Sequence, residues 1–437
     1  MSTFNYVASI TFTRRRLLRG WIAGVGVVSV NAVKSDDLRS QNRSRVLEVV
    51  RRQGVTSRTD IGSTTGLSPA TISAITADFL EEGVLLPARA DGAAAGGRGR
   101  PQVALELNPA VAVVGGVHFH FNGVSVVIAD YAGDCGEEFF TAMPTHELDA
   151  QELRSALCDC IEAALQQSSL DASKLCRLAV GVQGVIDADG TCVLWSPITA
   201  HRDLPVSDWM ESHFGVPTRI SNDCDLIARA LHWRDSATLG NNFAAVLLDH
   251  GVGMGLFLQN AIVNGTHSSG IEFGHMTYQP DGALCRCGNR GCIEAYAGDY
   301  AISRRAGAQS EQMPPSDAID NADLERVLVA AENGNADAIA AIDAAGAAIG
   351  TGLASLFALV DCFPVVLIGG GTIFFERMQT SLRRSLENSP TFNEKRPIEI
   401  SCYPQVSELV LQGGTISALK LHDQHIANNR QFTESAF

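Results

Sequence analysis

A dense set of metal-ligand side chains lies within residues 270–298, which read GIEFGHMTYQPDGALCRCGNRGCIEAYAG. The set consists of His275, Cys285, Cys287 and Cys292. Thiolates and imidazoles are the ligands that Zn²⁺ prefers, and four of them close a tetrahedral structural site. The alternative is four ordinary buried residues, because a free cysteine often packs as a small hydrophobic side chain. The close spacing of the cysteines favours a structural zinc site with one ion per chain.

Two carboxylates flank these ligands. Glu272 lies three residues before His275, and Glu294 lies two residues after the last cysteine. A carboxylate beside a metal can orient the metal ligands, and it can also accept hydrogen bonds from sugar hydroxyl groups. Gly288 and Gly291 lie among the cysteines, where a tight turn needs an unhindered backbone. The stretch therefore combines a metal site with acceptors for a polar ligand.

The patterns GxExGH and CxCGxxGCxE in this stretch resemble the signature of the ROK family, which groups repressors, uncharacterised reading frames and sugar kinases. The resemblance extends in weaker form over most of the chain from about Asn42. It implies an α/β fold in which a two-lobed, actin-like and ribonuclease H-like sugar-kinase domain carries a zinc knuckle. The implied zinc ligands are His275, Cys285, Cys287 and Cys292. The implied sugar contacts are Asn222, Asp223, Glu272, His275 and Glu294.

Charge is unevenly distributed along the chain, whose formal net charge is −15 over 437 residues. Residues 1–101 hold 14 bases and eight acids, a balance of +6, which leaves −21 for the remainder. A strongly acidic surface repels the phosphate backbone of DNA. We therefore expect any contact with DNA to be confined to the basic N-terminal segment.

The distribution of the cysteines along the chain indicates the cellular compartment of the protein. Only three of the 11 cysteines lie within residues 270–298, and the others, such as Cys158 and Cys362, are scattered through apolar or helical runs. Scattered thiols of this kind are typical of a reducing cytosol rather than of a disulfide framework. The sequence thus predicts a cytoplasmic protein that does not bind a membrane.

Residues 1–38 have a composition of their own. Arg14, Arg15 and Arg16 precede an apolar run that ends near Val33, a pattern that resembles a twin-arginine export signal. The apolar run is short for a membrane span. Because an exported DNA-binding protein would lose access to its target, we favour a disordered extension over residues 1–38. The export signal is the alternative.

Residues 39–107 have the pattern of a winged helix-turn-helix domain. An amphipathic helix is predicted from Asn42, a second short helix over residues 57–63, and a third helix that begins after Gly66 and is capped by Ser68. The positions predicted to face the core are Val46, Val49, Val50, Ile61, Ile72, Ile75 and Phe79. Two strands, over residues 84–86 and 103–107, would follow and flank a Gly-rich loop over residues 90–101.

This domain supplies the candidate DNA contacts. Small and polar residues at the start of a second helix, after a glycine turn, are what a helix-turn-helix places in the major groove. Arginines between glycines in the predicted wing can enter a minor groove. The alternatives are a generic helical cap and a flexible linker. The candidate DNA-binding residues are Arg58, Ser68, Ala70, Thr71, Ser73, Arg98 and Arg100.

Residues 108–437 are predicted to form the effector domain, with two lobes. Kinases of the family carry an Asp and a Gly-Gly-Thr turn that cradles phosphate, but here those places are taken by His118, His120, Phe121 and Asn122. Rings block the close backbone approach that glycine permits, and the carboxylate that would hold Mg²⁺ is lost. In the second phosphate loop, His250 replaces the usual Thr.

Other kinase features are retained. The resemblance places the catalytic base of the kinases at Asp223, next to Asn222. A retained carboxylate can also act only as a hydrogen-bond acceptor, and an asparagine at the start of a helix can cap it. Helices are predicted over residues 322–359 and 415–425.

These patterns predict a sugar-responsive DNA-binding regulator, a repressor of carbohydrate-metabolism genes that binds operator DNA and a sugar or sugar derivative. The rival is an active ATP-dependent hexose kinase of the same family, and a third possibility is a zinc-stabilised sugar sensor that does not bind DNA. The altered first phosphate motif argues for the regulator and against catalysis. Because one winged helix offers few base contacts, a homodimer or homotetramer is expected.

Overall fold

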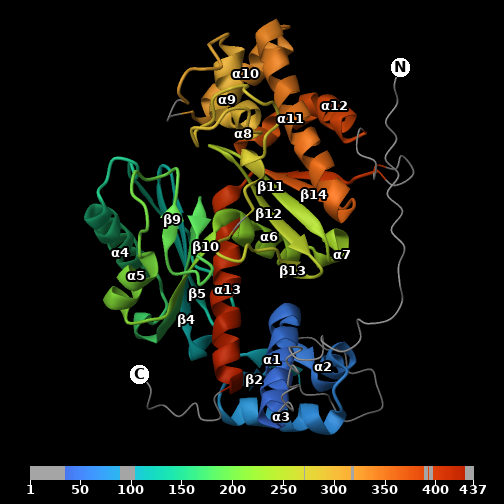
Figure 1. Cartoon of the computed structure of the whole chain (residues 1–437). Coiled ribbons are helices and arrows are strands. Elements are labelled where there is room, and N and C mark those ends of the chain that lie inside the picture. The colour runs from blue at the N-terminus through green and yellow to red at the C-terminus, as the bar shows by residue number, and fades with distance from the viewer. Residues whose placement is uncertain are drawn as a thin grey trace, which may run out of the picture.

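The structure is a computed structural model that describes residues 35–88, 104–269, 271–315, 319–387, 392 and 397–428 (Figure 1). An N-terminal unit of helices and a small sheet is followed by two lobes, each built on a five-stranded sheet. Most of the predicted extension, residues 1–34, lies outside the described residues, so its disorder stays a prediction.

The N-terminal unit contains three helices and a three-stranded antiparallel sheet of order β1-β3-β2. Its elements are α1 (Ser35–Gln53), β1 (Thr56–Ser57), α2 (Arg58–Thr65), α3 (Pro69–Glu81), β2 (Leu85–Pro87) and β3 (Ala104–Leu107). Helix α1 begins at Ser35, seven residues before the predicted start at Asn42. Residues 35–38, predicted to belong to a disordered extension, are therefore helical. Strand β1 was not predicted, because a two-residue strand has no periodicity to detect.

Capping fixes the ends of the short helices in this unit. The Ser57 hydroxyl accepts a hydrogen bond from the Asp60 backbone, and the Asp60 carboxylate accepts one from the Ser57 backbone, so the two residues form a capping box. Gly66 ends α2 at φ 70°, a left-handed conformation that glycine adopts without strain. Ser68 caps α3 by accepting from the Thr71 backbone, as predicted. The seven apolar positions predicted to face the core are all buried.

The first lobe has a sheet of order β10-β7-β4-β5-β6. Its strands are β4 (Val113–His120), β5 (Gly123–Asp130), β6 (Phe139–Ala142), β7 (Leu175–Val182) and β10 (Thr218–Asn222). An apolar cluster joins the sheet to two helices, α4 (Ala150–Gln167) and α5 (Val206–Phe214). A short hairpin of β8 (Val185–Ile186) and β9 (Val193–Trp195) extends toward the second lobe.

The second lobe has a sheet of order β13-β12-β11-β14-β15. Its strands are β11 (Phe243–Leu248), β12 (Val252–Leu258), β13 (Ala261–Ile262), β14 (Val365–Ile368) and β15 (Ile400–Tyr403). Its helices are α7 (Ser236–Leu239), α8 (Glu294–Ala297), α9 (Asp299–Ala306), α10 (Asn321–Glu332), α11 (Ala336–Val360) and α12 (Phe375–Leu386). Most of these helices gather at one end of the lobe, above the sheet in Figure 1.

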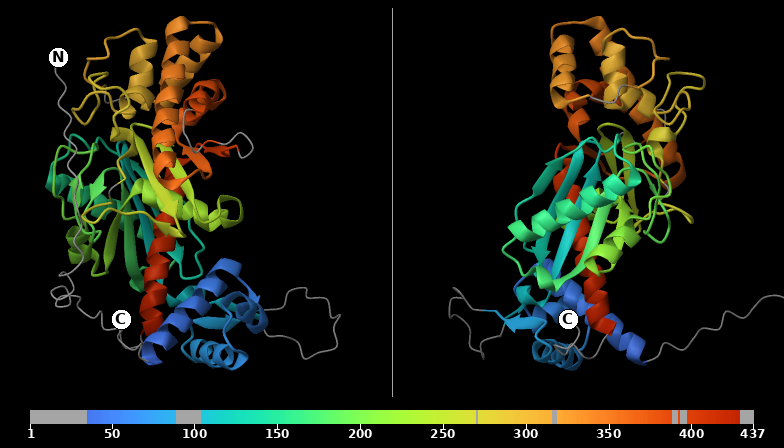
Figure 2. Two further views of the ribbon diagram at one scale, coloured as in Figure 1. Left: turned by 45° about the vertical axis from the view of Figure 1, so that its right-hand side comes forward. Right: turned by 90° about the vertical axis from the view of Figure 1, so that its left-hand side faces the viewer.

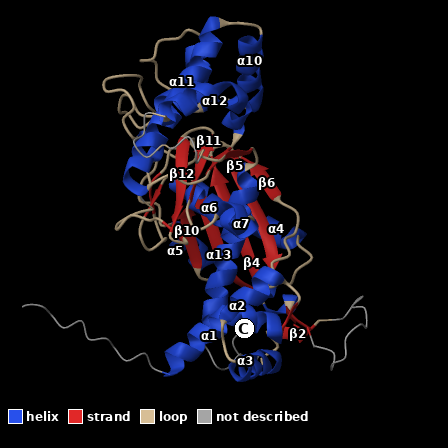
Figure 3. Ribbon diagram, turned by 90° about the vertical axis from the view of Figure 1, so that its right-hand side faces the viewer, coloured by secondary structure: helices blue, strands red, loops and turns tan. Residues whose placement is uncertain are grey.

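The two sheets share one topology. In each, the first three strands are antiparallel neighbours, and the fourth and fifth add parallel to the first on its other side. The helices that follow the fifth strands are exchanged between lobes. Helix α6 (Asp223–Arg234) packs on β11 and β12 of the second lobe, whereas α13 (Val406–Asn428) packs on β4 and β7 of the first. Figures 2 and 3 show α13 running between the sheets, where it also contacts α6.

Residues 322–359 form two helices instead of one continuous helix. Helix α10 ends near Asn333, Gly334 takes φ 84°, and the Asn335 side chain caps α11 by accepting from the Ala338 backbone. Among the described residues, α11 alone is long and apolar enough to cross a membrane. It packs against α8, α9 and α12 and supplies part of the core of the second lobe, which accounts for its apolar character.

Helix α13 also packs against the N-terminal unit. Arg51 on α1 forms a bidentate ion pair with Asp423 on α13, with Nε to Oδ2 and Nη2 to Oδ1 each at 2.8 Å. The Tyr131 hydroxyl donates to Asp423 Oδ1 at 2.6 Å, and Arg51 Nη1 donates to the Tyr131 carbonyl at 2.7 Å. One apolar cluster crosses the junction and includes Val46, Leu47, Val114, Ala129, Tyr131, Ala418, Leu419 and Ile426. The unit therefore shares a hydrophobic core with the effector domain.

Candidate functional site

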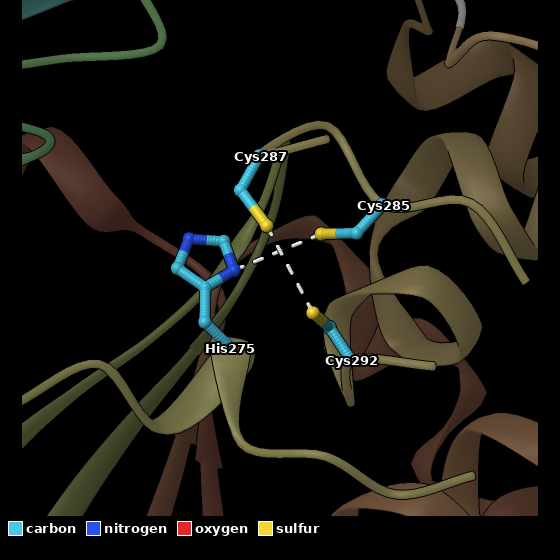
Figure 4. Close-up of side chains that lie close together, drawn as sticks. All are labelled: His275, Cys285, Cys287 and Cys292. Carbon is cyan, nitrogen blue, oxygen red and sulfur yellow. Dashed lines mark hydrogen bonds between the residues drawn. The ribbon is translucent and has the colours of Figure 1, made fainter. Parts of the chain in front are cut away.

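Four predicted metal ligands converge at the edge of the second lobe. His275 ends a short 3₁₀ helix (Phe273–His275), Cys285 and Cys287 lie in the loop that follows, and Cys292 lies just before α8. Figure 4 shows the four side chains pointing toward one common centre. Cys285 Sγ lies 3.7 Å from His275 Nδ1, and Cys287 Sγ lies 3.8 Å from Cys292 Sγ. All four ligand atoms lie within 4.8 Å of one another, so the cluster could hold a metal ion.

The donor set fits a tetrahedral zinc ion. With ordinary Zn–S and Zn–N bond lengths, two sulfurs of a tetrahedron lie about 3.8 Å apart, and a sulfur and a nitrogen lie about 3.6 Å apart. The two measured distances agree with these values. Burial raises the pKa of the Cys285 thiol, and it raises the pKa of the Cys292 thiol to about 11. A cation is therefore needed to hold these sulfurs as thiolates near neutral pH.

Glycine turns form the loop that holds the cysteines. Gly288 has φ 88° and Gly291 has φ 78°, both in the left-handed region. A Cβ at Gly291 would overlap the Gln279 carbonyl oxygen, so no larger residue fits there. Backbone hydrogen bonds from Cys285 to the Asn289 carbonyl at 2.9 Å, and from Gly288 to the Cys285 carbonyl at 3.0 Å, close the turn. The spacing of the ligands thus follows from the turn that the glycines permit.

A cavity between the lobes brings together all five residues that the sequence proposed for sugar binding. The first lobe and the start of α6 provide two of them, and the second lobe provides the others. The five are Asn222, Asp223, Glu272, His275 and Glu294. The side chain of His275 faces both sites, because Nδ1 points to Cys285 while Nε2 lies 3.7 Å from Glu272 Oε2.

Glu294 connects the metal cluster to this cavity. The carboxylate is buried, and Oε1 lies within 3.4 Å of Cys285 Sγ and 3.3 Å of the Tyr300 hydroxyl, both of which donate to it. Oε2 accepts from the Val252 backbone at 3.2 Å. A carboxylate held on both oxygens is oriented rigidly, so a change in the metal cluster would also move an acceptor in the cavity.

Asn222 and Asp223 lie at the end of β10 and the start of α6. The Asn222 side chain caps α6 by accepting from the Cys224 backbone at 2.8 Å, and its amide donates to the Gly184 carbonyl at 2.8 Å. Capping and cavity roles are therefore compatible, as expected from the sequence. Burial, together with the charge of Asp249, raises the pKa of Asp223 to about 6.

The cavity also has residues that sequence reasoning did not propose. These are Gln183, Trp195, His250 and Arg286. Trp195 meets the His275 ring edge-on, with centroids 6.2 Å apart. Arg286 lies between two ligand cysteines, so its place in the sequence was a usable signal. Gln183 and Trp195 come from the other lobe, where nothing in the local pattern marks them.

The altered first phosphate motif forms the turn between β4 and β5. Phe121 and Asn122 are the turn residues, and His118 and His120 lie on β4 just before them. Burial lowers the pKa of His118 well below its usual value and that of His120 to about 4. Both imidazoles are therefore neutral near pH 7 and offer no positive charge to a phosphate. Phe121 stacks on His146, with centroids 4.9 Å apart, so aromatic rings fill the turn.

The cleft beside this turn has a volume of about 760 Å³ and an acidic lining. Apart from His250, no basic side chain appears among the described residues that line it. Its carboxylates are Glu138, Asp249, Asp299, Asp320, Glu325 and Glu408. The polyanionic phosphates of ATP would meet a negative field here.

The candidate DNA contacts of the helix-turn-helix lie at the start of α3. Ser68, Ala70 and Ser73 are exposed, and Thr71 is half-buried. The Ser68 and Thr71 hydroxyls are hydrogen bonded to each other at 2.8 Å. The start of α3 therefore presents small side chains, most of them polar, to solvent.

The three candidate DNA-binding arginines do not lie at the start of α3. Arg58 is half-buried, and its Nε donates to the Thr76 hydroxyl at 2.7 Å, so its guanidinium ties α2 to α3. Arg98 and Arg100 lie outside the described residues, together with the predicted loop over residues 90–101. Their contact with DNA stays a prediction.

A sequence profile described as the ROK family matches residues 136–423. The chain belongs to the ROK family. A curated relative of this ROK chain is the xylose repressor of Caldicellulosiruptor bescii, which is 24% identical over 361 residues and covers 81% of this chain and 89% of the repressor.

Solved ROK structures share the fold. A ROK family transcriptional regulator, described as a homologue of the Escherichia coli MLC protein, has 22% identity and a TM-score of 0.71, covering 89% of this chain and 97% of its own. A ROK family glucokinase from Streptomyces griseus, in complex with glucose and AMPPNP, has 23% identity and a TM-score of 0.56. It covers 70% of this ROK chain and 99% of its own. The predicted sugar-kinase-like α/β fold is thus confirmed for the two lobes.

Proposed function

We propose that this ROK protein is a sugar-responsive, DNA-binding transcriptional regulator that represses carbohydrate-metabolism genes in the cytoplasm. One observation carries the proposal: a unit of three helices and a small antiparallel sheet is docked on a sugar-kinase-like domain, and aromatic rings and neutral imidazoles fill the turn between β4 and β5 of that domain. The match to a xylose repressor over 81% of the chain supports it.

The N-terminal unit is a winged helix in this proposal, and α3 is its recognition helix. Ser68, Ala70 and Ser73 at the start of α3 are exposed, whereas α1 forms the side of the unit that packs against α13 and Tyr131 of the effector domain. Arg98 and Arg100 in the wing would reach the minor groove. Residues 102–437 carry a formal net charge of −21, which repels DNA. Affinity for DNA therefore depends on pairing two N-terminal units in a homodimer or homotetramer on a palindromic operator.

Zinc is structural in this proposal. One ion held by His275, Cys285, Cys287 and Cys292 would fix the loop that carries them. Glu294 and the Nε2 edge of His275 would then be oriented toward the cavity. Asn222, Asp223 and Glu272 would complete a set of donors and acceptors for the hydroxyl groups of a sugar or sugar derivative.

Helix α13 provides the physical connection between sugar and DNA sites. Near its start, the Ser407 hydroxyl lies 3.0 Å from His118 Nδ1 at the interlobe cleft. Near its end, Asp423 pairs with Arg51 of the N-terminal unit. A sugar that favours one arrangement of the lobes would shift this helix, and it would change DNA affinity by its differential affinity for the two arrangements.

The rival function is an ATP-dependent sugar kinase, and one observation favours it: Asp223, at the place of the kinase base, is retained in the cavity. The acidic lining of the cleft and the neutral imidazoles oppose it. Incubation with ATP, Mg²⁺ and a panel of hexoses separates the two. We expect no turnover above background, and sugar-dependent ATP consumption would reverse the ranking.

DNA binding is tested with fragments from upstream of the protein's own coding region. We expect saturable binding in fluorescence anisotropy, with affinity that falls as salt rises. Ser73→Glu adds a negative charge at an exposed position near the start of α3 and should abolish binding. Ser355→Glu adds the same charge to an exposed site on α11 and should leave it unchanged. Equal affinities for the two variants would rule out α3 as the recognition helix, and a protein that binds sugar but no DNA would be a sensor only.

A further inference from the structure

A second cluster of metal-ligand side chains lies outside the cysteine site. Asp249 and His250 occupy the turn between β11 and β12, and Asp299 begins α9. One ligand atom of each residue lies within 4.8 Å of the others, and His250 Nδ1 is 2.7 Å from Asp299 Oδ2. All three residues line the 760 Å³ cleft.

The carboxylates of this cluster have little cationic compensation. The side chain of Asp299 is 4% exposed and that of His250 is 21% exposed. Asp299 accepts from the Tyr300 backbone, and Asp249 accepts from the His250 backbone at 3.0 Å. Among the ion pairs formed by described residues, the only one that reaches either carboxylate comes from His250. A half-buried carboxylate, Asp249, and a buried one, Asp299, thus share a single imidazole.

The pKa of Asp249 also indicates that the carboxylates of Asp249 and Asp299 are poorly compensated. Burial raises the pKa of Asp249, and the Asp299 carboxylate raises it further, while His250 opposes both effects. Buried carboxylates of like charge are usually neutralised by partners or by a metal. A divalent cation would relieve both the burial and the repulsion at once.

We propose that Asp249, His250 and Asp299 bind a divalent first-row cation through mixed oxygen and nitrogen ligation, with Mn²⁺ as the representative ion. Two carboxylates and one imidazole suit such an ion, whereas the cysteine cluster suits softer zinc. Ligand atoms around one ion lie roughly 3 to 4 Å apart, so binding needs adjustments below about 1 Å from the present positions. The proton shared by His250 and Asp299 leaves to solvent as the ion enters.

The remaining coordination positions of this ion would face the cleft, where water or an oxygen ligand can occupy them. The site lies in the second phosphate loop, at the residue that replaces the usual Thr, and it makes the cleft a cation site instead of an anion site. It does not depend on the DNA-binding proposal, because all three ligands belong to the second lobe.

The test is Mn²⁺ binding to the purified full-length protein, followed by electron paramagnetic resonance of the free ion, with zinc content measured before and after. We expect one saturable Mn²⁺ site per chain while zinc content stays constant. Asp299→Asn should weaken Mn²⁺ binding by at least about tenfold, the range that loss of an outer-shell partner already produces. His250→Thr, which removes the imidazole, gives an independent second variant with the same expected loss.

The control is Glu325→Gln, which removes the same charge from the same cleft but lies outside the cluster. Its Mn²⁺ affinity should match that of the wild type. Absence of saturable Mn²⁺ binding would overturn the proposal and leave a plain His–Asp ion pair. Equal weakening by Glu325→Gln and Asp299→Asn would also overturn it, because it would show diffuse attraction to an acidic cleft.

Discussion

The junction between Arg51 and Asp423 gives the sharpest energetic prediction. Arg51→Met removes the guanidinium and leaves the Asp423 carboxylate, which is 8% exposed, with the Tyr131 hydroxyl as its remaining partner at this junction. Removing one member of a buried ion pair costs about 3–5 kcal/mol, because an uncompensated charge stays buried. At about 1.4 kcal/mol per factor of ten, this lowers the population of the docked N-terminal unit by roughly two to three and a half orders of magnitude.

Hydrogen exchange followed by mass spectrometry measures this effect by segment. In Arg51→Met, amides of α1 and the C-terminal half of α13 should exchange faster, while those of β11 and β14 should keep their protection. Arg52→Met is the control on the next residue. Arg52 pairs with Glu48 at 3.7 Å and lies over the Trp233 ring at 4.7 Å, but its side chain is 31% exposed, and such partly exposed contacts contribute about 0–1 kcal/mol each.

A double variant tests the cause of the loss. Arg51→Met combined with Asp423→Leu removes the buried charge together with its partner, so most of the protection should return. If Arg51→Met and Arg52→Met change exchange in α1 equally, the ion pair does not hold the unit in place. The role assigned to α13 would then be wrong.

Three further predictions concern the zinc cluster, the cavity and the DNA surface. Cys287→Ser should reduce zinc from about one per chain to near zero and lower the melting temperature, as metal analysis and calorimetry will show, while Cys402→Ser at an exposed thiol should do neither. Asp223 has a folded-state pKa raised to about 6, so its favourable contribution to stability is present below about pH 4 and lost as pH rises through 6. Asp223→Asn should therefore be more stable than the wild type at pH 7.5, by at most about 3 kcal/mol in urea unfolding, with no gain at pH 4; a pH-independent difference would contradict this cause. Ser73→Ala should relax base preference at one operator position by about 1 kcal/mol in competition binding, with little change in salt dependence.

Local features of the sequence predicted local parts of the fold. The ligands of the cysteine cluster lie within 18 consecutive residues, and glycine turns bring them together without help from distant segments. The helix ends at Ser57, Gly66 and Ser68 depend on capping within three or four residues. The break between α10 and α11 was missed because the alanine-rich pattern continues on both sides of Gly334.

Parts that depend on distant contacts were not predictable. Arg51 and Asp423 are 372 residues apart in sequence, and nothing near either residue indicates the other. The cluster of Asp249, His250 and Asp299 joins a turn to a helix start 49 residues later. The sequence proposed Asn222 and Asp223 as well as three residues of the family motif for this cavity, but it did not mark Gln183 and Trp195, because only the packing of the two lobes brings them there.

The proposed function requires that sugar binding and DNA binding are thermodynamically coupled within one protein. The direct measurement is a closed cycle: DNA affinity with and without a saturating sugar identified by thermal-shift screening, and affinity for that sugar with and without operator DNA. We expect the two ratios to be equal and to differ from one by about 5- to 150-fold, as reciprocal linkage requires. If both ratios equal one while each ligand binds tightly, the sugar and DNA sites are not coupled, and the proposed regulation is wrong.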